Sequence, residues 1–204
     1  MISQEGSCSS INAPAGFLLI IMNVSFFRRF FKGSKAPVSI EARAEGGSAE
    51  AQFTLGLKFA NGKGPAQDYA RAAQWYLKAA EQSHALAQFN LGVMYAEGQG
   101  MPSDKAQSML WFDRAAHLGD PAAQYRLGMT HHRASLDRSP TNASESRIEA
   151  YKWLQLSDDQ GYRDSDMARG LVTLQMTREE VADGNRRVAG FLAAPSGATP
   201  NGAL

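Results

Sequence analysis

Two segments of this chain have nearly the same sequence, AQFTLGLKFANGKG at 51–64 and AQFNLGVMYAEGQG at 87–100. A Leu-Gly pair recurs at intervals of 36 residues, at Leu55-Gly56, Leu91-Gly92 and Leu127-Gly128. A repeat of this length is one supersecondary unit that cannot bury its own apolar face, so neighbouring copies must stack to bury it. The period therefore restricts the chain to an array of similar units.

Each unit divides into two predicted amphipathic helices. In the first copy Ala51, Leu55 and Phe59 recur every four residues, which places them on one face of a helix that the following glycines end. Asp68 is the expected N-cap of a second helix, whose apolar stripe ends at Ala79-Ala80. We therefore expect an all-α protein, an α-solenoid of stacked antiparallel helix pairs.

The third copy departs from the period. Trp111 follows Trp75 by 36 residues, but Trp153 follows Trp111 by 42, so six extra residues fall within 133–148. The polar composition of this insert predicts a loop.

The pattern A-x-A-Q-x-x-L-G-x-x-[YF]-x-x-G-x-G, followed by D and then by A-x-x-W-[YF]-x-x-A-A, resembles the Sel-one-like repeat family, relatives of the tetratricopeptide repeats. The resemblance covers repeats 49–84, 85–120 and 121–162. It implies a solenoid that binds other proteins as a scaffold, without catalysis of its own. The third repeat differs from the pattern in having His-His-Arg at 131–133 instead of GxG, and Ser-Asp-Asp at 157–159 instead of small residues.

The array is expected to span 47–193 and to end in closing helices at 163–193, which resemble those of bacterial members of the family. Thr177 and Glu180 have the spacing of a capping box, which predicts a last helix from about Arg178 to about Leu192. The small-residue tail 194–204 is expected to be disordered. The expected structural core of the repeats is Leu55, Gly56, Trp75, Leu91, Gly92, Trp111, Leu127, Gly128 and Trp153.

The N-terminal arm, residues 1–46, is expected to be flexible or amphipathic, with a linker at 33–47. Its apolar run from Phe17 to Phe27 would span about 16 Å as a helix, against a bilayer core of about 30 Å. Met22 is an alternative natural start. The segment Phe26–Phe31 alternates aromatic pairs with arginines, which fits either a cover for the first helix or a membrane-surface contact.

Composition argues against several kinds of site. The formal net charge of +1 leaves no basic excess for nucleic acid. Cys8 is the single cysteine, and the adjacent His131 and His132 would point in different directions on a helix, so we expect no metal and no cofactor. No nucleophile-and-base set can be assembled, so we expect no catalytic residues. A hydrolase activity is sometimes ascribed to a cysteine-rich branch of the family, but this chain lacks the paired cysteines of that branch.

A protein or peptide partner is expected to bind on the concave face, which the first helix of each repeat would line. Counting from each Leu-Gly pair places Phe53, Phe89 and Tyr125 on this face, although such recurring aromatics also fit packing against the neighbouring helix pair. Exposed positions that vary between copies are the better candidates, because the stack does not dictate them. The predicted partner-binding residues are Lys58, Glu97, Arg126, Met129, His132 and Arg133.

The sequence therefore predicts a monomeric, non-catalytic interaction scaffold. A membrane-associated structural subunit, tethered by Phe26–Phe31, is the alternative function. We expect a cytoplasmic location, with the membrane surface or the periplasm as alternatives.

Overall fold

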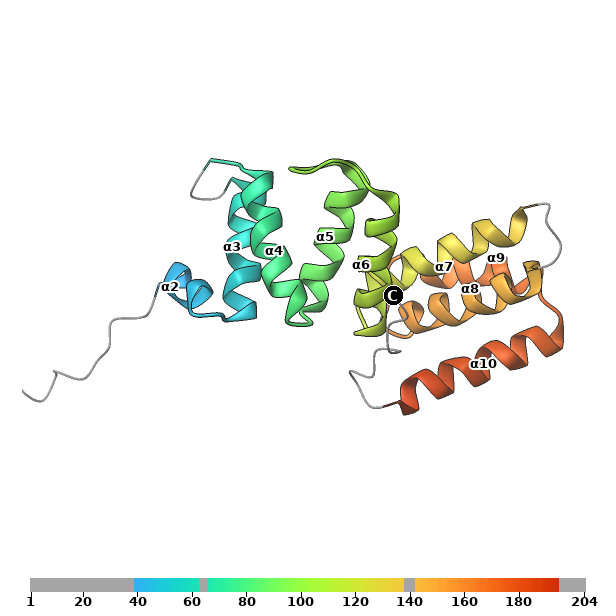
Figure 1. Ribbon diagram of the computed structural model, residues 1–204. Helices are drawn as coiled ribbons and strands as arrows, with labels where there is room; N and C mark the ends of the chain where they lie inside the picture. The colour runs from blue at the N-terminus through green and yellow to red at the C-terminus, as the bar shows by residue number, and fades with distance from the viewer. Residues whose placement is uncertain (1–38, 63–65, 138–141, 195–204) are drawn as a thin grey trace, which may run out of the picture. The chain divides into compact units, whose positions relative to one another are not determined.

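The computed structural model describes residues 39–62, 66–137 and 142–194. This part of the chain contains nine helices and no strand (Figure 1). The expectations for Cys8, Met22, Phe26–Phe31 and the tail after residue 194 lie outside the described residues. The helices are α2 (Ile40–Glu45), α3 (Ala49–Asn61), α4 (Tyr69–Glu81), α5 (Ala85–Glu97), α6 (Lys105–His117), α7 (Pro121–Leu136), α8 (Ala143–Asp158), α9 (Ser165–Thr173) and α10 (Arg178–Ala193).

Three helix pairs form the repeats, α3 with α4, α5 with α6, and α7 with α8. Each pair packs against the next through its second helix, and α9 and α10 both pack against α8. The all-α fold, a solenoid of stacked helix pairs, is confirmed.

Side-chain caps and glycines set the limits of the helices in the first two repeats. Asp68 and Asp104 accept hydrogen bonds from the free backbone N–H groups at the starts of α4 and α6. Gly98 ends α5 with a φ of 70°, in the left-handed region where a Cβ is disfavoured. Gly100 lies against the backbone of Tyr69, so close that a Cβ would come within 2.4 Å of its carbonyl carbon. The second glycine of GxG therefore allows this turn to contact the preceding repeat.

The Leu-Gly pairs bring the two helices of a repeat together. A Cβ on Gly92 would lie 2.8 Å from the ring of Phe112, closer than side chains pack. The same relation holds between Gly56 and Tyr76 and between Gly128 and Leu154. The residue that follows the tryptophan of each repeat thus fills the space that the glycine leaves.

Each repeat tryptophan packs on the unit before it. Trp111 lies in a cluster with residues of α4 and α5, and Trp153 lies in a cluster with residues of α6 and α7. Both are nearly inaccessible, at 6% and 2% exposure. Trp75 packs beside Ile40 and is only half-buried, because the short α2 is its neighbour. The other eight predicted core residues are buried.

The linker prediction for 33–47 is wrong over Ile40–Glu45, which form helix α2. Ala44 of α2 is buried against α3, and its carbonyl accepts a hydrogen bond from Gln52 at 3.0 Å. Gln88 donates in the same way to Ala80, 36 residues after Ala44. Helix α2 therefore takes the place of a second repeat helix.

The loop prediction for 133–148 is wrong at both ends. Helix α7 continues to Leu136 and α8 begins at Ala143, so each is 16 residues long where the earlier repeat helices have 13. Without a glycine at 131–133, nothing stops α7 where α3 and α5 stop. The helices therefore absorb the six extra residues.

The Ser-Asp-Asp departure is accommodated by polar partners. Ser157 is fully buried and donates a hydrogen bond to the carbonyl of Pro121 at 2.8 Å. Asp158 pairs with Arg169 of α9 at 3.1 Å. At this position the earlier repeats have an alanine that packs on the next repeat. Here α9 takes the place of a further repeat, and its arginine pairs with the Asp158 carboxylate.

The last helix matches its predicted capping box. The Thr177 hydroxyl accepts from the backbone N–H of Glu180, and the Glu180 carboxylate accepts from the backbone N–H of Thr177 at 2.8 Å. Phe191 packs against the third repeat, whereas Leu192 is 65% exposed.

Candidate functional site

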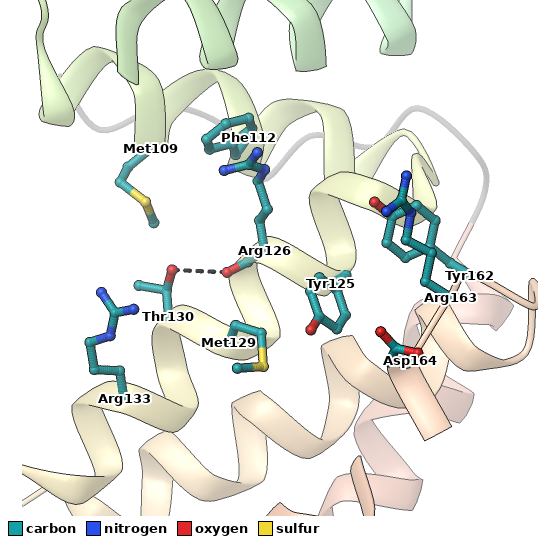
Figure 2. A pocket seen from close by; sticks show the side chains of 10 residues that line it. All are labelled: Met109, Phe112, Tyr125, Arg126, Met129, Thr130, Arg133, Tyr162, Arg163 and Asp164. Carbon is teal, nitrogen blue, oxygen red and sulfur yellow. Dashed lines mark hydrogen bonds between the residues drawn. The ribbon is translucent and has the colours of Figure 1, made fainter. Parts of the chain in front are cut away.

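A pocket of about 470 Å³ opens between α6, α7 and the turn that leads into α9 (Figure 2). This volume is within the range of small-molecule or side-chain binding sites. Its lining is mixed, with aromatic, sulfur-containing and charged side chains. The lining residues are Met109, Phe112, Tyr125, Arg126, Met129, Thr130, Arg133, Tyr162, Arg163 and Asp164.

The inner wall of this pocket is apolar. Phe112 is buried at 4% exposure, and Tyr125 and Met129 are half-buried and belong to or contact the neighbouring cores. The Thr130 hydroxyl donates to the backbone carbonyl of Arg126 at 2.8 Å, as Figure 2 shows, so it is already engaged within its own helix. The wall therefore offers an apolar surface to a ligand.

Arginine side chains form the outer part of the pocket. The Arg126 guanidinium lies 5.0 Å from the centre of the Phe112 ring and 5.7 Å from that of Phe89. Arg163 lies 5.9 Å from the Tyr162 ring. Such cation–π contacts hold a guanidinium by its face and leave its N–H edge free to donate.

A second pocket, of about 240 Å³, lies between α3, α4 and α5. Several of its residues precede a residue of the first pocket by 36 positions: Tyr76 corresponds to Phe112, Asn90 to Arg126 and Val93 to Met129. Successive repeats therefore present pockets from corresponding positions. The two differ in charge, because the lining of the second contains no ionisable Arg, Lys, Asp or Glu.

The structure brings together three of the six predicted partner-binding residues, Arg126, Met129 and Arg133, in the lining of the first pocket. The other three lie outside both pockets.

The three predicted residues outside the pockets differ in their contacts within the protein. Lys58 pairs with Glu41 of α2 at 3.3 Å. Glu97 accepts a hydrogen bond from Gln99 at 2.6 Å. His132 is half-buried, and its Nδ1 is enclosed without a hydrogen-bond partner among the described residues.

The recurring aromatics are held by packing within the protein. Phe53 stacks on His84 with ring centres 4.6 Å apart, and Phe89 contacts Phe112 at 5.5 Å. Tyr125 contacts Tyr162 at 5.7 Å. Of the three, Tyr125 alone lines either of the two pockets described above, so intramolecular packing explains the recurrence of an aromatic at this position.

Sequence reasoning missed the residues that come from the turn, Tyr162, Arg163 and Asp164. One signal was available: Tyr162 stands at the register position where His84 and Asp120 cap the next helix. A tyrosine cannot cap in this way, so the chain had to take another route before the next helix. Arg163 has a φ of 37°, an uncommon conformation for a residue with a side chain.

The ionisable side chains that line the first pocket are those of three arginines, two tyrosines and one aspartate. Its lining contains no serine, cysteine or histidine. Elsewhere, a hydrogen bond to Asp113 raises the pKa of His117, and burial lowers the pKa of His131. Within the described ranges, no three His, Cys, Asp or Glu side chains are grouped so as to hold a metal ion. No helix in these ranges has the length and hydropathy needed to span a bilayer.

Comparison with known proteins agrees with the architecture. The family model described as "Sel1 repeat" matches residues 49–84, 85–120 and 121–162. The crystal structure of a Sel1 repeat protein from Oxalobacter formigenes is 32% identical, with a TM-score of 0.55, over 64% of this chain and 94% of that one.

A second solved structure is c5321, described as a protective antigen of uropathogenic Escherichia coli with an SLR fold. It is 21% identical, with a TM-score of 0.61, over 81% of this chain and 37% of that chain. It therefore shows the fold alone. A search of curated proteins found no match.

Proposed function

This chain belongs to the Sel1 repeat family, whose members are generally protein-interaction scaffolds, and from that premise we propose that it binds a partner protein through the pockets along its repeats. The pockets carry this proposal because they recur at corresponding positions of successive units. A row of similar sites along a solenoid fits an extended segment of a partner better than a compact small molecule.

The lining of the larger pocket combines apolar and cationic side chains, with Asp164 as its one carboxylate and no serine, cysteine or histidine, which supports a binding function. Met129 and Val93 are half-buried at the pocket walls, where each packs against a core on one side and offers apolar contact to the pocket on the other. Apolar walls with polar rims are typical of peptide-binding surfaces.

Site-specific photo-crosslinking tests this proposal. We expect a benzophenone amino acid at position 129 or 93 to crosslink a partner in cells that express the protein. The same group at Gln74 or Glu179, both exposed and outside the pockets, serves as the control. The proposal would be contradicted if the control positions crosslink the partner with the same yield as positions 129 and 93. It would also be contradicted if none of the four positions gives a crosslink.

A further inference from the structure

Unpaired positive charge is concentrated in the larger pocket. Three of its ten lining residues are arginines and one is an aspartate. Across the described ranges, no ion pair involves Arg126, Arg133 or Arg163. Elsewhere Arg71, Arg147, Arg169, Arg186 and Arg187 are each paired with a carboxylate. Arg43, Arg114 and Arg178 also have no ion pair among the described residues, but each lies on a different helix, whereas three such arginines line this one pocket.

This charge is specific to the third repeat. Asn90 and Glu97 stand 36 residues before Arg126 and Arg133, so the preceding repeat is neutral or acidic at the same positions. The stack does not require a cation there, because the second repeat packs without one. Recognition of a partner of opposite charge explains the presence of the two arginines better than packing does.

The spacing of the two arginines restricts the spacing of the acidic groups that a ligand can present to them. Arg126 and Arg133 both lie on α7, seven residues apart, which is two turns and about 10 Å along one face of the helix. In an extended peptide the side chains on one face recur every second residue, so residues four apart share a face at about 13 Å, a span that two long arginine side chains can reach. Between them lies Met129, one turn from each, on the apolar wall.

The geometry points to an acidic, extended peptide segment as the occupant of this pocket, with two carboxylates four residues apart and a large apolar side chain midway between them on the same face. The carboxylates accept hydrogen bonds from Arg126 and Arg133, and Arg163 adds positive charge at the rim. The apolar side chain occupies the space between Met129, Tyr125 and Phe112. This inference rests on the proposed function and adds the chemical class of the partner.

Peptide selection tests this assignment. The probe is a phage-displayed library of random peptides, selected on the full-length protein and counter-selected on a variant with Arg126→Glu and Arg133→Glu. We expect the peptides that only the wild type retains to be enriched in two Asp or Glu residues flanking a Leu, Met or Phe. Neutral or basic consensus peptides, or no enrichment over the counter-selected pool, would overturn the assignment.

Synthetic peptides then give the size of the effect. By fluorescence anisotropy, each single change, Arg126→Gln or Arg133→Gln, should weaken binding of a selected peptide by roughly tenfold or more, as for a lost charge-assisted hydrogen bond. Arg43→Gln, an exposed arginine of α2, is the matched control and should leave affinity unchanged. The double glutamate variant should instead favour the peptide with lysines in place of its acidic residues. An unchanged preference for the acidic peptide would contradict direct contact.

Two further measurements distinguish a failure of the assigned peptide chemistry from a failure of the proposed scaffold function. The circular-dichroism spectrum and melting temperature of the double variant should remain close to wild type, since both arginines are exposed. If crosslinking at position 129 captures a partner but no acidic peptide is selected, the assigned chemistry is wrong and the scaffold function stands. If neither occurs, both are wrong. Stronger binding of a short nucleic acid than of any acidic peptide would also overturn the assignment.

Discussion

The contacts between successive repeats and the contacts with the closing helices stabilise the molecule in different ways. Between repeats the same contacts recur: a tryptophan on the preceding unit, a large side chain against a glycine, and a glutamine bound to a preceding carbonyl. At the other end, α10 is joined to α8 by ion pairs, with Arg187–Glu149 at 2.7 Å and Arg147–Glu180 at 2.6 Å.

The difference follows from position in the array. Between identical units, one apolar interface can be repeated without change. The last unit has no identical neighbour, so its exposed face must be covered by helices that are not copies. Ion pairs and buried hydroxyls fix the orientation of these helices where repeated packing cannot.

The largest expected effect concerns the interior of the regular region. Trp111→Ala should lower the free energy of unfolding by about 3 to 5 kcal/mol, because the indole is buried and has a packed unit on each side. Equilibrium unfolding in urea measures the change.

Trp75→Ala is the matched comparison at the α2 end. It should lower the free energy of unfolding by clearly less, because this ring is already half-exposed. Equal losses at the two positions, or a loss below about 1 kcal/mol for Trp111→Ala, would refute the stacking account.

The second prediction concerns the ionic contacts of the closing helices. Glu180→Gln should lower the free energy of unfolding by about 1.5 to 3 kcal/mol, the range for hydrogen bonds to charged groups, since Arg147 loses its charged partner. Glu179→Gln, at an exposed neighbouring position, should change it by no more than about 0.5 kcal/mol. Chemical denaturation of both variants decides whether the closing helix depends on this one carboxylate.

Acid should weaken the same contact. Burial tends to raise the pKa of Glu180, but hydrogen bonds from Arg147, Ser144 and the Thr177 backbone lower it from 4.5 to about 2. A lowered pKa contributes stability that is complete above pH 4.5 and is lost as the pH falls towards 2. The stability difference between wild type and Glu180→Gln should therefore shrink over that interval. A difference that stays constant would show that the charge of Glu180 is not what stabilises α10.

The smallest expected effect is an increase in the free energy of unfolding. Gln82 donates to Gln52 Oε1 at 2.7 Å and Gln160 donates to Gln124 Oε1 at 2.9 Å, but Leu118 stands at the corresponding place in the second repeat. There Gln88 Oε1 is buried and has no partner among the described residues.

Leu118→Gln should supply the missing donor to Gln88 and raise the free energy of unfolding by about 0.5 to 1.5 kcal/mol. Leu118→Asn, one methylene shorter, is the control and should give no such gain. A Leu118→Gln variant no more stable than Leu118→Asn would show that the glutamine pairs do not stabilise the stack.

The repeats could be predicted from sequence because their contacts recur. A period of 36 residues is visible without knowing which atoms meet, and the capping box at Thr177 is local enough to be read directly. Helix α2 was missed because, of its six residues, only Ala44 and Glu45 match the period, which is too short a segment to predict a helix alone. The helical conformation of α2 depends on its contacts with α3, and a local sequence pattern does not indicate such contacts.

The pocket was only partly predictable for the same reason. Arg126, Met129 and Arg133 share a helix face, and their register was enough to place them together. Arg163 and Asp164 approach them from a turn more than 25 residues later in the chain, through a backbone conformation that no repeat position specifies. His132, predicted together with them, lies outside this pocket and is half-buried, because variability between copies does not report exposure.

Unequal end contacts give the array a direction of local unfolding. In a molecule whose units contact only their neighbours, opening begins at the most weakly held terminal unit and propagates inward. Helix α2 has six residues and leaves Trp75 half-exposed, whereas the opposite end is held by two helices and several ion pairs. Amide exchange should therefore be fastest in α2 and α3 and slow progressively towards α8, so that the α6–α7 pocket remains assembled while the first repeat frays.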